Sequence, residues 1–354
     1  MVTPSLGVGG AERWIIDMVR STCNVIKWNV AASGWGLIDK DLSTELMKLC
    51  NVYCNKPAIC VDNISIPLVE NNYDGMIITG PDFGKCVQIA SEFSDIIITW
   101  AVPDIGNIVP NFEGPIIYVS HTDVRSPVKI EGHTHQVGVS KQSLNHFVDK
   151  NKPTSVLWNG ADPRIGTDTE TWEIVNKWSM LNNVVGQIGR HVPLKQYLLT
   201  AEAMFQQKDL MFVNYGSNPQ GEICPKLKQI CEENVPNHYL SKPIKLIGSA
   251  ISNFEAIIMP SLQEANSLAV IEAMLCRVPI ITTNVGAIPE FEERFGDMVY
   301  KIDTNINAET LRSVIYKVLS TDNSKMISDN YNIALEHMTI EAMGKRWYNY
   351  MCSL

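Results

Sequence analysis

The chain has 354 residues, of which 45% are hydrophobic and 19% are charged. This balance excludes an intrinsically disordered chain, and the length is sufficient for two domains. The formal net charge of −9 argues against a nucleic-acid-binding protein, because phosphate neutralisation requires a basic surface. No apolar run reaches the roughly 20 residues of a membrane span, so we expect no stable membrane insertion. The nine cysteines show no zinc-type spacing, and we expect thiols of a cytoplasmic protein that binds no metal.

Apolar, β-branched runs alternate with segments of helical period, which predicts βαβ units and parallel sheets. In the first half the expected strands are Trp28–Ala32, Asn51–Tyr53, Gly75–Thr79, Ile96–Trp100, Ile116–Ser120 and Gln136–Val139. The helices expected between them are Ala11–Arg20, Ser43–Leu49, Phe83–Glu92 and Lys141–Val148. Only Met1–Pro4 precede the first glycine-rich stretch, so we expect a very short first strand.

The second half repeats the same alternation. Its expected strands are Val184–Ile188, Leu210–Val213, Ala256–Met259 and Ile280–Thr283, and its expected helices are Leu194–Phe205, Glu222–Glu233, Leu268–Cys276 and Ala308–Leu319. The turn-forming residues between Asn159 and Thr169 predict a domain boundary there. We therefore expect Rossmann-like domains over residues 1–160 and 161–335, facing across a cleft. Residues 336–354 are expected to form a helix that packs back on the first domain.

The segment Pro260–Met274 contains two glutamates eight residues apart, Glu264 in a turn and Glu272 in a helix. Asn266 or Ser267 is expected to cap this helix, and the N–H groups of its first turn, with the helix dipole, suit a diphosphate. Carboxylates that accept hydrogen bonds from paired hydroxyls suit a sugar and a ribose. From spacing alone, Glu264 could equally be an ordinary loop acid and Glu272 part of a solvated helix face.

Three weaker features accompany this segment. Arg190 and Lys195 follow an expected strand and could neutralise a diphosphate, although a loop with two basic residues is more often plain surface charge. Gly9 and Gly10 allow the backbone to approach a ligand, or simply form a tight turn. His121, after another strand, could bind a sugar hydroxyl or act in acid–base chemistry, although a lone histidine is more often structural.

In their order along the chain, these segments resemble retaining glycosyltransferases of the two-Rossmann-domain (GT-B) type, family 4, also called group 1. The sequence PSLQEANSLAVIEAMLCRVPIITTNVGAIPE is similar to the donor-site signature of that family. Weaker matches, in the family's order, are Gly9–Arg13, Val139–Ser140, Asn159–Asp162 and the segment from Gly189 to Lys195. The resemblance therefore extends over nearly the whole chain.

The resemblance implies transfer of a hexose from a nucleoside-diphosphate sugar, with UDP or GDP as the expected carrier. The transfer would retain the anomeric configuration, use no metal or other cofactor, and proceed on the front face of the sugar. Arg190 and Lys195 would then bind the diphosphate, together with the backbone of Asn266, Ser267 and Leu268. Glu264 would contact the sugar and Glu272 the ribose. His121 would lie against the sugar, and the backbone of Gly9 and Gly10 near the donor and acceptor.

The chain also departs from the family pattern. Gln196 and Arg277 stand where the family commonly has glycine, and the turn after Glu264 lacks the family's aromatic residue and glycine. The last difference leaves the identity of the sugar open. The acceptor is open as well, among saccharides, small molecules and a modified base. Two other hypotheses are a nucleotide-sugar epimerase or hydrolase on the same fold, and a catalytically idle GT-B scaffold protein.

Overall fold

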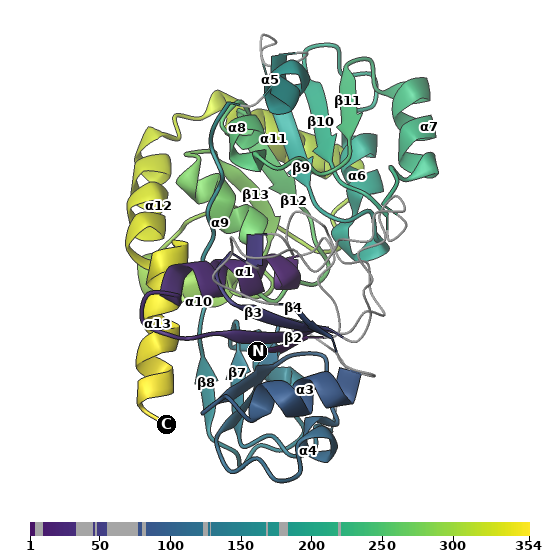
Figure 1. Cartoon of the computed structure of the whole chain (residues 1–354). Coiled ribbons are helices and arrows are strands. Elements are labelled where there is room, and N and C mark those ends of the chain that lie inside the picture. Colours follow the sequence, from purple (N-terminus) through teal and green to yellow (C-terminus); the bar gives the residue numbers. More distant parts are fainter. Residues whose placement is uncertain are drawn as a thin grey trace. The chain divides into compact units, whose positions relative to one another are not determined.

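The computed structural model describes residues 1–3, 10–32, 45–46, 48–54, 77–79, 83–122, 127, 129–167, 169–176, 183–218 and 221–354. These residues form two compact units (Figure 1). The first unit contains Met1–Gly160 and Ile340–Leu354, and the second contains Ala161–Thr339.

The first unit is built on an eight-stranded parallel sheet of order β4-β3-β2-β1-β5-β6-β7-β8. Its strands are β1 (Val2–Thr3), β2 (Asn29–Ala32), β3 (Asn51–Cys54), β4 (Ile77–Thr79), β5 (Ile97–Thr99), β6 (Ile116–Ser120), β7 (His135–Gly138) and β8 (Thr154–Val156). The strand order reverses direction between β1 and β5, and ligands of doubly wound sheets bind at such a point.

The helices of the first unit are α1 (Gly10–Thr22), α3 (Phe83–Ser91), α4 (Ile105–Ile108) and α13 (Ile340–Cys352). Helix α13 lies beside α1 although more than 300 residues separate them in sequence (Figure 1). Trp347 of α13 is fully buried, and its ring centroid lies 5.5 Å from that of Trp14 in α1. The last helix is therefore part of the core of the first unit.

The second unit contains a six-stranded parallel sheet of order β11-β10-β9-β12-β13-β14. Its strands are β9 (Val184–Ile188), β10 (Met211–Tyr215), β11 (His238–Ser241), β12 (Ala256–Met259), β13 (Ile280–Thr283) and β14 (Tyr300–Ile302). Numbered within this unit, the order is 3-2-1-4-5-6, which is that of a Rossmann sheet. The point where the order reverses lies between β9 and β12.

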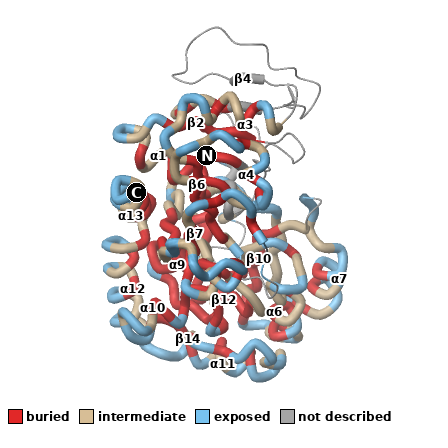
Figure 2. Tube along the Cα trace, turned by 90° about the horizontal axis from the view of Figure 1, so that it is seen from below, coloured by how far each residue is buried: buried red, intermediate tan, exposed pale blue. Residues whose placement is uncertain are grey.

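The helices of the second unit are α5 (Thr169–Asn176), α6 (Tyr197–Ala203), α7 (Pro225–Asn234), α8 (Ile247–Ile251), α9 (Leu268–Leu275), α10 (Ile288–Phe295), α11 (Ala308–Ser320) and α12 (Ser324–His337). The residues of β9, β10, β12 and β13 are almost all buried, and Figure 2 shows the buried residues concentrated along the strands. Among the described helices, none combines the length and apolarity needed to cross a membrane.

The expected alternation of strands and helices in parallel sheets is confirmed, and four strands match their expected bounds in full: β6, β9, β12 and β13. The helix expected over Lys141–Val148 is instead a short 3-10 helix over Gln142–His146. Here the side chains of Ser140 and Ser143 each accept a hydrogen bond from the backbone N–H of the other. Such bonds compete with the α-helical pattern. The helix expected over Ser43–Leu49 and the strand expected over Gly75–Thr79 lie partly outside the described residues.

Candidate functional site

The loops after β9 and β12 lie next to each other, because these two strands are neighbours at the point where the strand order reverses. The β9 loop contains Arg190 and Lys195, and the β12 loop contains Ser261 and Glu264. The backbone N–H of Leu262 donates a hydrogen bond to the carbonyl of Leu194, which joins the two loops directly. The expected site residues on these two loops therefore lie together at the carboxyl ends of the central strands, where ligands of this fold bind.

Lys195 and Glu264 form an ion pair between the two loops. The Nζ atom of Lys195 donates a hydrogen bond to Oε1 of Glu264, and the hydroxyl of Ser261 donates to the same oxygen over 2.8 Å. Neither side chain is fully buried, with exposed fractions of 24% for Lys195 and 16% for Glu264. Among the described residues, the second oxygen of Glu264 has no hydrogen-bond partner, so it could accept a bond from a ligand hydroxyl.

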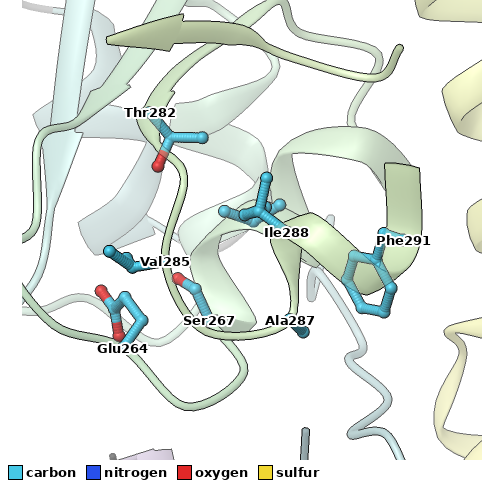
Figure 3. A pocket seen from close by; sticks show the side chains of 8 residues that line it. Glu264, Ser267, Thr282, Val285, Ala287, Ile288 and Phe291 are labelled. Carbon is cyan, nitrogen blue, oxygen red and sulfur yellow. The ribbon is translucent and has the colours of Figure 1, made fainter. Parts of the chain in front are cut away.

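The loop after Glu264 leads into α9, an eight-residue helix whose N-cap is Ser267. Of the two expected capping residues, Asn266 and Ser267, the structure places Ser267 at the N-cap position. Its hydroxyl lies 3.8 Å from the sulfur of Met259 and accepts no bond from the helix, so the expected side-chain cap is absent at Ser267. Glu264 and Ser267 line a pocket together with Val270, Thr282, Val285, Ala287, Ile288 and Phe291 (Figure 3). The start of α9 therefore faces an open space next to a carboxylate.

Glu272 is buried within α9 and is 8% exposed. The guanidinium of Arg164 donates a hydrogen bond from Nη2 to Oε1 of Glu272 over 3.2 Å. This ion pair compensates the burial of the carboxylate, and it shows that Glu272 does not lie on a solvated helix face. Arg164 was not among the expected site residues, because 108 residues separate it from Glu272 and no local pattern links the two.

Arg190 differs from Lys195 in its surroundings, because its side chain is exposed. Among the described residues, no carboxylate forms an ion pair with it. The next residue, His191, is buried, so neighbouring side chains of this loop point in opposite directions. Arg190 therefore presents an unpaired cation at the end of β9, where an anionic ligand could bind it.

The two positions at which the chain lacks the glycine common in the resembling family have left-handed backbone conformations. Gln196, directly after Lys195, has φ of 46°, and Arg277, after α9, has φ of 61°. Arg164 also has a positive φ, of 52°. Non-glycine residues in this region are strained by about 1–2 kcal/mol each. Both positions therefore have a backbone conformation that glycine adopts more readily than the residues present.

His121 belongs to the first unit and follows β6. Its ring lies edge-on to Trp14, with centroids 4.5 Å apart, and its buried Nε2 atom has no hydrogen-bond partner within the part of the chain that the structure describes. Burial lowers the pKa of His121 to about 3, so the ring is neutral near pH 7. A neutral ring can bind a ligand hydroxyl, but it is not a cationic acid. Gly10 begins α1, and Gly9 lies outside the described residues.

The second unit therefore places Arg190, Lys195, Glu264 and the start of α9 around the ends of β9 and β12, with Glu272, the partner of Arg164, further along α9. Cations and backbone N–H groups suit phosphates, and carboxylates suit the paired hydroxyls of sugars. This combination of groups fits a ligand that contains both a diphosphate and polyol rings.

Comparisons with known proteins agree with this chemistry. Residues 182–318 match the family model described as Glycosyl transferases group 1. No curated protein matches the chain in sequence. Among solved structures, HepE from Anabaena in complex with UDP-glucose aligns with a TM-score of 0.76 and 19% identity, over 100% of this chain and 99% of that one.

Two further structures show the same likeness. Sucrose-phosphate synthase from Thermosynechococcus elongatus aligns with a TM-score of 0.70 and 14% identity, over 99% of this chain and 98% of that one. A glycosyltransferase from Rickettsia africae aligns with a TM-score of 0.72 and 16% identity, over 99% and 96% of the two chains. At these identities the likeness shows the fold, and the expected fold class of two Rossmann-like domains of GT-B type is confirmed. The chain thus has the fold of GT-B glycosyltransferases, and its residues 182–318 match the family model described as Glycosyl transferases group 1.

Proposed function

We propose that this protein transfers a hexose from a nucleoside-diphosphate sugar to an acceptor hydroxyl, with retention of the anomeric configuration and without a metal. The observation that carries the proposal is the meeting of Lys195 with Glu264 at the end of β9 and β12, beside the start of α9. To bind a diphosphate attached to a sugar, a site requires a cation for the phosphate beside a group that accepts a hydrogen bond from a sugar hydroxyl. Lys195 supplies the cation and Glu264 supplies the hydrogen-bond acceptor.

In the proposed complex, Arg190 and Lys195 bind the diphosphate together with the first N–H groups of α9. The free oxygen of Glu264 accepts a hydrogen bond from the transferred sugar, and Glu272 binds the ribose. During transfer the bond between the anomeric carbon and the phosphate oxygen breaks, and the acceptor oxygen bonds to the same face of that carbon. The acceptor proton moves to the departing phosphate. The cations stabilise the negative charge that develops on this leaving group.

A uridine nucleotide is the first donor to test, because HepE was crystallised with UDP and with UDP-glucose. The acceptor class stays among saccharides, small molecules and a modified base. Because the described cysteines are free thiols, we place the protein in a reducing compartment, the cytoplasm.

The test is a thermal-shift panel of UDP, GDP, ADP, CMP and TDP and their common sugars. A ligand at 100 times its dissociation constant stabilises the folded state by about 2.7 kcal/mol, which raises the melting temperature measurably. We expect one nucleotide family to stabilise the wild type and expect Glu272→Ala and Arg190→Ala to lose the shift. If no nucleotide shifts the wild type at millimolar concentration, the donor site is idle and the scaffold hypothesis replaces this one.

A second assay separates transfer from the epimerase or hydrolase hypothesis. The nucleotide-sugar that stabilises the wild type is incubated with the enzyme alone, and then with a library of hydroxyl acceptors. A transferase consumes the donor at an appreciable rate only when an acceptor is present. Rapid consumption or isomerisation of the donor without any acceptor would contradict the proposal.

A further inference from the structure

Three buried polar side chains lie beneath the β9 loop and connect it to the rest of the second unit. They are Gln187 in β9, His191 in the loop and Asn214 in β10, and none is more than 4% exposed. We call these three residues the buried network. The proposed function uses none of them. They are too far apart in sequence to form a local motif.

The hydrogen bonds of the buried network run in one direction. The backbone N–H of Cys224 donates to Nδ1 of His191 over 3.0 Å, so the ring proton is on Nε2. The Nε2 atom donates to Oδ1 of Asn214 over 2.7 Å, and Nδ2 of Asn214 donates to Oε1 of Gln187 over 3.5 Å. Finally, Nε2 of Gln187 donates to the carbonyl of Lys195 over 3.0 Å. The network therefore ends on the backbone of a proposed donor-binding residue.

The backbone around the network fixes the other end of the same loop. The N–H of His191 donates to the carbonyl of Ser217 over 2.7 Å, directly after the exposed Arg190. A Cβ atom at Gly216 would lie 2.1 Å from the carbonyl oxygen of Gly189 and 2.7 Å from the ring of His191. Only glycine allows this close approach. The loop after β10 is thus held against the loop after β9 beside Arg190, while Gln187 holds the backbone of Lys195.

The charge state of His191 supports this arrangement. Burial lowers the pKa of His191, so the ring is neutral near pH 7 and Nδ1 can accept the bond from Cys224. The ring of Tyr197 packs against the imidazole with centroids 5.0 Å apart, and its hydroxyl lies 3.4 Å from the sulfur of Cys224. The groups that contact His191 on this side are the ring of Tyr197 in α6 and the backbone N–H of Cys224, which precedes α7.

We propose that the buried network positions Arg190 and Lys195 for the diphosphate, with His191 and Gln187 as positioning residues. This inference rests on the proposed function. Two long cationic side chains on a mobile loop lose considerable entropy when they converge on one ligand, and a fixed backbone removes part of that loss. Removal of the network should therefore weaken binding of the diphosphate group while binding of the nucleoside is unchanged.

The main test uses Gln187→Glu, which has nearly the same shape but replaces the N–H donor to the Lys195 carbonyl by an oxygen. The matched control is Asn330→Asp, because Nδ2 of Asn330 also donates to a buried carbonyl, that of Met298 over 2.7 Å, away from the site. Calorimetry measures the dissociation constants of UDP and uridine for the wild type and both variants at pH 8. We expect Gln187→Glu to weaken UDP binding at least tenfold and to change uridine binding less than twofold. Asn330→Asp should change neither.

Two further measurements separate positioning from general destabilisation. Burial raises the pKa of a carboxyl group, so the new glutamic acid should become protonated as the pH falls toward 5.5 and donate to the Lys195 carbonyl again. UDP binding by Gln187→Glu should then recover relative to the wild type. If Gln187→Glu does not fold at pH 8, His191→Phe keeps the contact with Tyr197, lacks both hydrogen bonds and should show the same selective loss.

The results distinguish a failure of the positioning role from a failure of the proposed function. Unchanged UDP affinity in Gln187→Glu and His191→Phe, or equal losses for UDP and uridine, would overturn the positioning role alone. A wild type that binds neither UDP nor any other nucleotide of the panel would overturn the proposed function, and the positioning role with it.

Discussion

Lys195 and Glu264 form an ion pair across two loops that are 69 residues apart in sequence, and Ser261 donates to the same carboxylate oxygen. In the apo protein this pair keeps a cation and a carboxylate side by side at the edge of the sheet. A ligand with a phosphate next to a hydroxyl could bind both side chains, which are already in place before the ligand arrives. The structure therefore supplies a preformed contact that the chemistry of sugar transfer requires.

The first prediction concerns this pair. Lys195→Met should weaken UDP binding by about 10- to 100-fold, because a charge-assisted hydrogen bond to phosphate contributes roughly 1.5–3 kcal/mol. Glu264→Gln should leave UDP binding nearly unchanged and lower the transfer rate, since the proposed contact of Glu264 is with the sugar. Calorimetry and a transfer assay measure the two effects. Lys242→Met, which breaks an exposed ion pair with Glu222, is the control and should change neither.

The second prediction concerns the pair of Arg164 and Glu272. Arg164→Gln leaves a buried carboxylate without its cation, and we expect the free energy of unfolding to fall by about 1–3 kcal/mol. Arg164→Gln combined with Glu272→Gln should recover part of that loss. Urea denaturation of the two single variants and the double variant gives the coupling energy. Strictly additive effects would show that the ion pair contributes nothing to stability.

The third prediction concerns Gly286, in the loop after β13. Its φ is 65°, and a Cβ atom there would lie 2.6 Å from the carbonyl oxygen of Ala265 and 3.0 Å from that of Glu264. Gly286→Ala should therefore displace the Glu264 loop and lower both stability and transfer. The control is Gly296→Ala, where φ is 89° but no atom lies within 4 Å of the added Cβ. With ψ of −170° at this position, that variant should show only the backbone strain of about 1–3 kcal/mol and normal transfer.

The fourth prediction concerns the last helix. Trp347 is fully buried against Trp14, so Trp347→Ala should lower the free energy of unfolding by about 3–5 kcal/mol. Tyr348, its neighbour in α13, is 39% exposed, and Tyr348→Ala should change stability by less than about 0.5 kcal/mol. Deletion of Ile340–Leu354 should lower the melting temperature at least as much as Trp347→Ala. An unchanged melting temperature after the deletion would refute a core role for α13.

The fifth prediction is a loss of stability in mild acid. Burial lowers the pKa of His121 to about 3 and that of His133 to about 4, while the unfolded chain takes up these protons near pH 6.5. The stability from these neutral rings is complete above pH 6.5 and decreases as the pH falls toward 4. Each ring contributes a slope of up to about 1.4 kcal/mol per pH unit. Urea denaturation at pH 7 and pH 5 should show this decrease, and His121→Phe should show a smaller one.

The central strands of the second unit could be predicted from the sequence with nearly correct bounds. Val184–Ile188, Ala256–Met259 and Ile280–Thr283 are short apolar runs, because both faces of a covered parallel sheet are buried. The edge strands β11 and β14 were not predicted, because most of their residues are half-buried or exposed. Edge strands lack the continuous apolar pattern on which such a prediction depends.

The sequence by itself determined the residue types of the site: two glutamates at fixed spacing in one segment, and two cations at another strand end. Local spacing is enough for this because one loop and one helix carry the glutamates and a single loop carries the cations. Only the tertiary structure decided which groups meet, as for Arg164 with Glu272 and for His191 with Asn214. The order of strands in the sheet brings the two members of each pair together. Burial then excludes water, so each polar group requires a partner from elsewhere in the chain.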